Sequence, residues 1–344
     1  MITLSHDQLE IRFPEVHPKA KLSINFRRTL RIPDDGKDYP LPPGLGQFPL
    51  RHTEDHTNVL DSADVRKGGV ILPIYQSEAL WIRFEGSFVR DHDTEYPFAI
   101  QIGTGKVCAV TGEPWTDTLL RNTQNYLVVP GQPWLDGYCV EEGIIRQFVA
   151  APLGTGVTAE EQITGKAEHG GLQIQVYPMK RKVFERRFPK RPRHEDIVYA
   201  RSALNRMMVN CSPGERKMGL APGGRMRQHI YRDRFQLEDW DTSQRSRTFV
   251  HLLNSTQWKS ITGEKPPHKP IRARDYAQAG LPWFDYYDDK RAGVKATESL
   301  SKLKGLVSFK KHRSDEDQTT LALDELPVTH LGPAGKRPVQ EGKF

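Results

Sequence analysis

The chain has 344 residues, which is enough for one large or two modest domains. Only 37% of the residues are hydrophobic and the mean hydropathy is −0.63, because one central segment is dense in charge and the region after Phe309 is nearly all polar. No run of about 18 apolar residues occurs, and residues 1–15 lack the apolar segment of a secretion signal. A membrane-spanning or secreted protein is therefore not expected, and we predict a soluble cytoplasmic one.

The cysteines and the net charge further limit the classes of protein to which the chain can belong. Cys108, Cys139 and Cys211 are far apart and show no C-x-x-C spacing. An odd count in a long chain argues against a disulfide scaffold and against a structural zinc site. The net charge of +7 results from 50 basic and 43 acidic residues. By itself this charge bears on solubility and non-specific binding rather than on a role.

Short strands separated by turns fill the first half of the chain. Residues 21–32 give the clearest pattern, since apolar and polar side chains alternate and only Arg28 breaks the apolar face. Glycine- and proline-rich turns separate the runs. This spacing predicts an antiparallel sandwich or barrel over residues 5–179. The expected strands cover 21–32, 70–75, 79–89, 96–102, 107–110, 126–129, 144–150 and 172–177.

The second half has a different character, and we expect a smaller α+β region over residues 195–309. A basic connector at 180–194 leads into it. Helical spacing is present at 195–209, 247–262 and 272–279, and a Pro/Gly-rich loop is expected at 212–224. Residues 310–344 are too polar to fold alone, which predicts a disordered tail.

No cofactor-binding motif is complete, so we expect no cofactor. Gly103-Thr104-Gly105-Lys106 lacks the other members of a P-loop, and a strand rather than a helix follows it. His169-Gly170-Gly171 matches part of an oxyanion-hole loop, but the chain has no G-x-S-x-G elbow.

Three ionisable residues remain as weak catalytic candidates: Glu161, Glu168 and His169. A carboxylate beside an imidazole raises the pKa of the imidazole and orients its proton, which is the basis of acid/base catalysis. We favour the alternative that these residues lie on a solvated hairpin.

Three histidines are weak candidates for metal ligands. On a helix, His52 and His56 would lie on one face. The local sequence has no apolar stripe that would fix a helix there, and no spacing connects His92 to the pair. We therefore expect no metal site.

Two arginine-bearing segments are candidates for contacts with anions. The run from Lys180 to Arg193 interleaves Phe184 and Phe188 with basic residues, among them Arg186, Arg187 and Arg191. Such a run suits a nucleic-acid backbone, an acidic protein or a solvated connector, and we favour the connector. In the loop 221–228, Arg225 and Arg227 follow two glycines, a pattern that suits either an anion nest or a plain connection.

An aromatic cluster stands out near the C-terminus: Trp283, Phe284, Tyr286 and Tyr287. Large aromatic side chains anchor protein interfaces, or they clasp a terminal segment to its own core. The cluster is therefore a possible binding site.

The sequence favours a non-catalytic structural or protein-interaction subunit, with a protein partner or self-association in a homo-oligomer. Every catalytic pattern lacks an essential member, whereas aromatic segments and sheet edges are features that interfaces use. The first alternative is an enzyme of hydrolase or acid/base type with a dispersed His/Glu/Asp site. The second is a nucleic-acid-associated protein that uses the basic segment 180–193. No membrane partner is expected.

Overall fold

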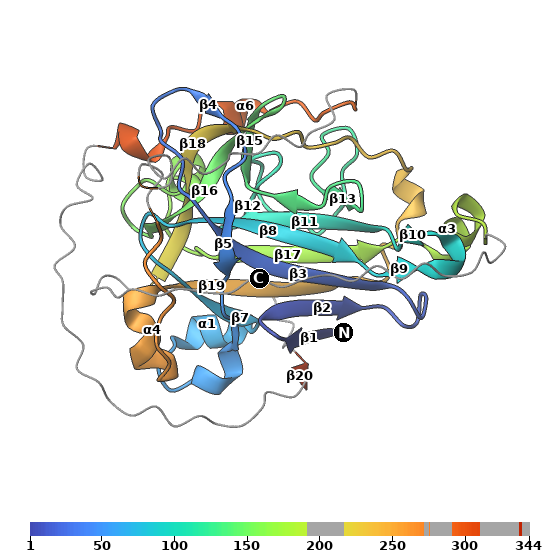
Figure 1. Cartoon of the computed structure of the whole chain (residues 1–344), viewed down its shortest axis with the longest axis horizontal. Coiled ribbons are helices and arrows are strands. Elements are labelled where there is room, and N and C mark those ends of the chain that lie inside the picture. Colours follow the sequence, from blue (N-terminus) through green and yellow to red (C-terminus); the bar gives the residue numbers. More distant parts are fainter. Residues whose placement is uncertain (191–216, 272–274, 276–290, 310–336, 339–344) are drawn as a thin grey trace.

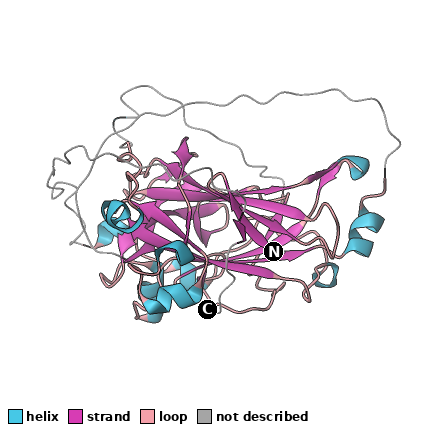
Figure 2. Ribbon diagram, turned by 90° about the horizontal axis from the view of Figure 1, so that it is seen from below, coloured by secondary structure: helices cyan, strands magenta, loops and turns pink. Residues whose placement is uncertain are grey.

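The computed structural model describes residues 1–190, 217–271, 275, 291–309 and 337–338, and these residues form a mainly antiparallel β-structure with a few short helices (Figure 1). The predicted fold class is therefore confirmed. The helices of the described residues are all too short or too polar to span a lipid bilayer. Figure 2 shows these helices at the margins of the strands.

The strands form two runs of neighbours that meet at one corner. The first run is β1 (Ile2–Ser5), β2 (Gln8–Arg12), β3 (Lys21–Thr29), β8 (Ala79–Gly86), β16 (Ile144–Pro152) and β18 (Lys217–Arg227). The second run is β13 (Leu127–Val129), β11 (Phe98–Thr104), β17 (Leu172–Pro178), β19 (Ser246–Asn254), β7 (Val70–Ile74) and β6 (Arg51–His52). They join where Lys217 and Met218 of β18 pair with Leu253 and Leu252 of β19.

One apolar core fills the space between the two runs. Buried side chains of both belong to a single cluster, for example Phe26 and Ile82 from the first run and Ile100, Ile174 and Leu252 from the second. This arrangement is what the alternation of apolar and polar residues predicts for a sandwich-like protein.

Shorter elements complete the fold. The remaining strands are β4 (Asp38–Tyr39), β5 (Gly44–Gln47), β9 (Phe88–Val89), β10 (Thr94–Glu95), β12 (Val107–Cys108), β14 (Trp134–Leu135), β15 (Gly137–Glu141) and β20 (Arg337–Pro338). The helices are η1 (Thr53–His56), α1 (Ser62–Lys67), η2 (Arg90–His92), α2 (Ala159–Thr164), α3 (Arg181–Arg187), η3 (Leu237–Asp239), α4 (Ser255–Thr262), α6 (Glu298–Ser301) and η4 (Leu306–Ser308).

Each of the eight predicted strands overlaps a strand of the structure, but the helix predicted over residues 247–262 is wrong in its first half. That half is β19, and only Ser255–Thr262 is helical, as α4. β19 lies between β17 and β7 and is buried on both faces, so its sequence shows no alternation that would mark it as a strand. Asn254 begins α4 by accepting a hydrogen bond from the Thr256 N–H at 3.1 Å.

The loop predicted over residues 212–224 is wrong from Lys217 onward, because that part is β18. The glycines of β18 allow close packing against neighbouring residues and do not form a turn. A Cβ on Gly224 would lie 2.2 Å from the Pro33 carbonyl oxygen, and one on Gly223 would lie 2.5 Å from the side chain of Val149.

The sheet also continues across the expected boundary at residue 180, since β18 pairs with β16 and β19 pairs with β17. The helices predicted at 195–209 and 272–279 fall outside the described residues except Asp275. Most of the predicted disordered tail also falls outside them, and Arg337–Pro338 within it form β20.

Buried glutamines hold the irregular segments to the sheet. Gln147 of β16 is 0% exposed; its Nε2 donates to the Leu30 carbonyl at 2.8 Å and its Oε1 accepts from the Ile32 N–H at 3.0 Å. Gln173 of β17 binds the Lys106 N–H and the Gly170 carbonyl in the same way. These amides take the place of a neighbouring strand, because buried backbone groups need hydrogen-bond partners. Other buried glutamines are Gln101, Gln124, Gln132, Gln175 and Gln228.

We predict that Gln147→Leu, which keeps the size of the side chain, lowers the free energy of unfolding by about 2–6 kcal/mol. It leaves one backbone carbonyl and one backbone N–H buried without partners, at about 1–3 kcal/mol each. Urea denaturation measures the change. Gln76→Leu is the matched control, because Gln76 is exposed. A Gln147→Leu variant within ~0.5 kcal/mol of the wild type would contradict this role.

Candidate functional site

The basic helix α3 is fixed to the body of the protein by one aromatic side chain. Phe184 is 0% exposed, and its ring centroid lies 4.5 Å from that of Tyr96, 4.8 Å from that of His92 and 5.5 Å from that of His17. Phe188 packs against Phe184 at 5.4 Å. The two phenylalanines of the basic run therefore face inward.

Hydrogen bonds hold the two ends of α3. Before the helix, the Tyr96 hydroxyl donates to the Met179 carbonyl at 2.7 Å, and the Lys180 N–H donates to the Asp239 carbonyl at 2.9 Å. After it, Nδ1 of His92 is hydrogen-bonded to the Phe188 carbonyl. Within the segment predicted as a connector, Arg181–Arg187 therefore form a helix that is docked on the body of the protein at both of its ends.

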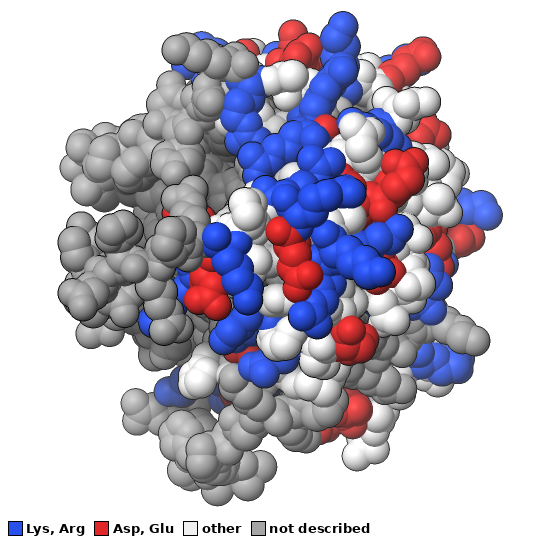
Figure 3. Space-filling view, turned by 90° about the vertical axis from the view of Figure 1, so that its right-hand side faces the viewer, with Lys and Arg blue, Asp and Glu red and all other residues white. Residues whose placement is uncertain are grey.

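The basic side chains of this segment point outward. Residues 180–190 hold six basic residues and one acidic residue, so they carry a net charge of +5 within a chain of +7. The side chains of Arg181 and Arg186 are 59% and 71% exposed. Figure 3, which faces the end of the molecule that carries α3, shows a band of Lys and Arg side chains with a few acidic ones among them.

Neighbouring loops add arginine to this surface and fix it in place. The Arg187 guanidinium lies 2.5 Å from an Asp239 carboxylate oxygen and 5.4 Å from the ring centroid of Phe235. The Arg234 guanidinium lies 5.0 Å from the same ring. Arg121 donates to the side chain of Gln236, which directly precedes η3. The aromatic ring and the acid together restrict the arginine side chains.

Two exposed apolar side chains belong to the same end of the molecule. Phe88, 55% exposed, is in β9, which immediately precedes η2 and its His92. Leu120, 46% exposed, precedes Arg121 in the chain. We call the whole surface the α3 face; it comprises Phe88, Leu120, Lys180, Arg181, Lys182, Arg186, Arg187, Lys190 and Arg234.

His17 lies beneath the α3 face in a setting that disfavours its charged form. Its ring stacks on that of Tyr96 at a centroid distance of 5.1 Å, and its Nδ1 accepts a hydrogen bond from the Lys19 N–H at 3.0 Å. Burial, and then the nearby Arg181, lower the pKa of His17. Protonation at Nδ1 would also break the hydrogen bond from Lys19.

We predict that the stability of the protein falls as the pH drops below about 6.5, the unfolded pKa of histidine, and that His17→Phe reduces this fall. The unfolded chain binds a proton at a pH where the folded His17 does not, so acid favours unfolding. Urea midpoints measured between neutral and acidic pH test this. His6→Asn is the control for the loss of a histidine elsewhere, because His6 is exposed. An unaltered slope in His17→Phe would contradict the assignment.

The three acid/base candidates lie near one another, but the Glu161 carboxylate has structural partners. The Glu161 carboxylate accepts from the N–H groups of Gly154, Gly156 and Thr158 and from the Thr158 hydroxyl, and so caps α2. Glu168 lies 3.7 Å from His169 Nε2, and burial lowers the pKa of this histidine.

Their neighbour Glu160, which is 3% exposed, holds the turn that carries Glu168 and His169. Its carboxylate oxygens accept from three consecutive N–H groups, those of residues 168, 169 and 170, at 2.8–2.9 Å. The sequence did not single out this role, because a buried glutamate looks like any exposed one in a single sequence.

The metal candidates do not converge. His52 is buried with Nδ1 3.7 Å from a Glu54 oxygen, and burial lowers the pKa of His56. His92 is hydrogen-bonded beneath α3, in a different part of the sheet. Among the described residues, no group of three or more His, Cys, Asp or Glu side chains is placed to hold a metal ion.

The segment 221–228, which was expected to be an anion nest or a plain connection, belongs to the strand β18 as far as Arg227. Arg225 is in β18, where its guanidinium lies 2.7 Å from Asp38 and 2.7 Å from Glu141. Arg227 ends the same strand. Arg191 and the aromatic residues Trp283, Phe284, Tyr286 and Tyr287 lie outside the described residues.

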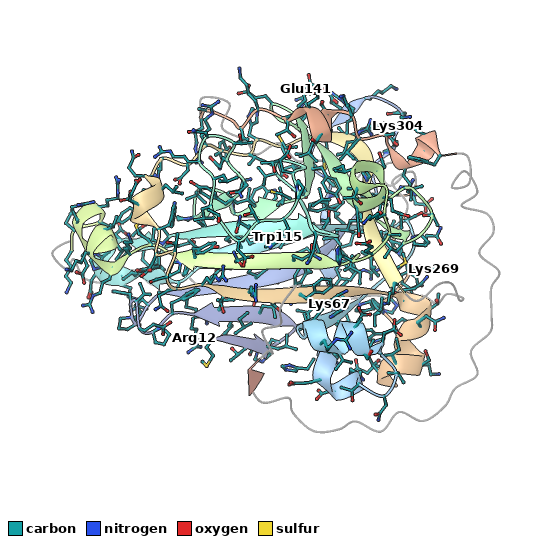
Figure 4. All side chains as sticks on the ribbon, turned by 180° about the vertical axis from the view of Figure 1, so that it is seen from behind. Arg12, Lys67, Trp115, Glu141, Lys269 and Lys304 are labelled. Atoms are coloured by element: carbon teal, nitrogen blue, oxygen red, sulfur yellow. The ribbon has the colours of Figure 1, made fainter. Side chains whose placement is uncertain are left out.

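A partly buried charged cluster that the sequence did not indicate joins α1 to β18 and β19. Lys67, labelled in Figure 4, and Lys217 each place their Nζ 3.2 Å from an Asp64 oxygen. Nδ1 of His251 lies 3.8 Å from Asp64, and its Nε2 lies 2.9 Å from the Gly68 carbonyl. Burial lowers the pKa of His251 to about 4. These residues are far apart in the chain, so no spacing reveals them, and their contacts are structural.

A shallow hollow of about 280 Å³ lies between α2 and α6. Gln162 on its wall is hydrogen-bonded to the backbone of Lys304 through both its amide oxygen and its amide nitrogen. The side chains of Lys302 and Lys304 are exposed at its rim. The hollow therefore offers positive charge but no paired acid and base.

No protein-family model, curated protein or solved structure matches this chain. The functional assignment therefore depends on the geometry alone.

Proposed function

We propose that this protein is a non-catalytic interaction subunit that binds an acidic surface of a partner protein through the α3 face. We place this role in the cytoplasm, where cysteines such as Cys108 and Cys139, buried and unpaired here, are kept reduced. The observation that carries the proposal is the rigid docking of a strongly basic helix at one end of the molecule.

Rigid docking favours binding because less conformational freedom is lost when a partner arrives. Phe184 fixes the helix axis, and Arg187 is oriented by Asp239 and by the ring of Phe235. The exposed Phe88 and Leu120 add apolar contact area beside the charges. Arginine and aromatic residues are enriched in protein interfaces, and charge complementarity steers association.

The inward placement of the two phenylalanines favours a protein partner over nucleic acid. Single strands are bound by exposed rings on which bases stack, together with basic side chains. Phe184 is fully buried and Phe188 is partly buried, so the interleaved rings do not offer such a platform. Glu185 also interrupts the positive surface, which suits a patterned protein surface better than a continuous phosphate backbone.

We rank an enzyme lower because the carboxylates at the acid/base candidates are already used in hydrogen bonds to the backbone. Glu161 caps a helix and Glu160 binds backbone N–H groups, so neither carboxylate is directed at a substrate site.

We predict that the double variant Lys182→Glu, Arg186→Glu weakens binding to an acidic peptide by roughly tenfold or more, about 1.4 kcal/mol. Fluorescence anisotropy with a labelled peptide of alternating Glu and Tyr residues measures this at several salt concentrations. Both side chains are exposed, so the fold should persist. Arg66→Glu is the control for a charge reversal elsewhere, because α1 lies at the opposite end of the molecule from α3 (Figure 1).

A labelled oligo(dT) strand serves as the competing ligand in the same assay. Tighter binding of the oligonucleotide than of the peptide, lost in the double variant, would replace the protein partner by nucleic acid. Arg66→Glu changes the net charge by half as much, so a loss of binding free energy in the double variant no more than twice that in Arg66→Glu would show that binding follows net charge alone and would overturn the α3 face as the site.

A further inference from the structure

Two histidine rings contact the aromatic side chain that anchors α3. The ring centroid of Phe184 lies 4.8 Å from that of His92 and 5.5 Å from that of His17. Tyr96 packs against both Phe184 and His17. Phe184 and Tyr96 are fully buried. The docking of this seven-residue helix therefore includes two groups that can gain a positive charge.

The two histidines differ in what protonation does to their hydrogen bonds. A carbonyl oxygen only accepts, so Nδ1 of His92 carries the hydrogen in its bond to the Phe188 carbonyl, and a protonated ring keeps this bond. Nδ1 of His17 instead accepts from the Lys19 N–H at 3.0 Å, so protonation at this nitrogen breaks the bond. His17 is therefore the ring whose protonation the local structure opposes.

The charged groups that face His17 also oppose its protonation. Among the described residues these groups are Arg181 and Glu185 of α3, His92 of η2, and Lys19 in the turn of His17 itself. Glu185 is the acid in this set, and its carboxylate already accepts from the Arg181 guanidinium at 2.8 Å. Burial, and then Arg181, lower the pKa of His17 by more than Glu185 raises it.

Helix α3 can leave its position without breaking the sheet. It follows β17 and takes part in none of the strand pairs. Within α3 only Phe184 is buried. Segments with few buried side chains open at a lower free energy than the core of a protein does. Separation of α3 from the body would remove Phe184 and Arg181 from His17 while the strands stay paired.

We propose that protonation of His17 releases α3 from the body of the protein, so that acid disassembles the α3 face. In the released state His17 regains water and loses its contact with Arg181. The released state therefore binds the proton more tightly, and the docked state is favoured above about pH 6.5 and weakens as the pH falls below it. The release concerns this chain alone, whereas its consequence for a partner rests on the function proposed above.

Hydrogen exchange of the full chain, followed by mass spectrometry, tests the release. The protection of the amides of residues 181–188 is compared at about pH 7.5 and about pH 5.5, with exchange times scaled for the intrinsic rate. At the lower pH a histidine with an ordinary pKa is about tenfold more protonated than neutral, so the released population should rise by up to roughly tenfold. His17→Gln, which keeps an acceptor but cannot be charged, should lose most of this rise. His6→Gln is the control for the loss of a histidine elsewhere, because His6 is exposed.

The amides of β17, the strand before α3, serve as the internal reference. We expect α3 to be less protected than β17 at both pH values. Equal protection of the two segments would show that they open only together, which would overturn a separate release. A rise in exchange of α3 that is the same in the wild type and in His17→Gln would overturn the role of His17.

The labelled peptide of alternating Glu and Tyr residues tests the link to function separately. If the α3 face binds this peptide, saturation with it should increase the protection of α3. A pH effect on α3 without any protection by the peptide would support the release and overturn the α3 face as the binding site. Protection by the peptide without a pH effect would support the proposed function and overturn the release.

Discussion

The fold depends on the need of buried backbone groups for hydrogen-bond partners. Long irregular segments lie against the sheet, and their N–H and C=O groups cannot reach water. Glutamine side chains on the strands supply the partners, as Gln147 does for Leu30 and Ile32. An amide offers one acceptor and two donor hydrogens, so it can replace a neighbouring strand at a single position. Without these side chains, the segments would have no fixed position on the sheet.

The same constraint positions the α3 face. Oε1 of Gln124 accepts from the Asp233 N–H at 2.8 Å, which fixes the segment that leads to η3. The Asp233 carboxylate in turn accepts from the Trp240 indole at 2.9 Å and from the Tyr126 hydroxyl at 2.6 Å. Asp239 lies next to Trp240 and contacts both Lys180 and Arg187. The buried side-chain amide of Gln124 therefore helps to fix the position of Arg187 on the α3 face, through Asp233, Trp240 and Asp239.

Sequence reasoning found the strands whose two faces differ and missed the elements whose faces do not. β3 was predictable because Leu22, Ile24 and Phe26 alternate with polar residues. β19 was not, because both of its faces are buried. For the site, the basic run was visible, but the sequence could not show that Phe184 faces inward. Gln147 and Leu30 are separated by 117 positions, and no local pattern connects residues so far apart.

The need of backbone groups for partners also separates the interior of the protein from its edge at β1. In the interior, backbone groups of irregular segments are hydrogen-bonded to side chains on the strands, as Leu30 and Ile32 are to Gln147. These bonds fix the position of such a segment on the sheet. At the outer edge of β1, Arg337 and Pro338 of β20 lie opposite Leu4 and Thr3 and continue the strand pairing there. The binding proposed for the α3 face depends instead on the charge and orientation of side chains, which the buried hydrogen bonds beneath that face hold in place.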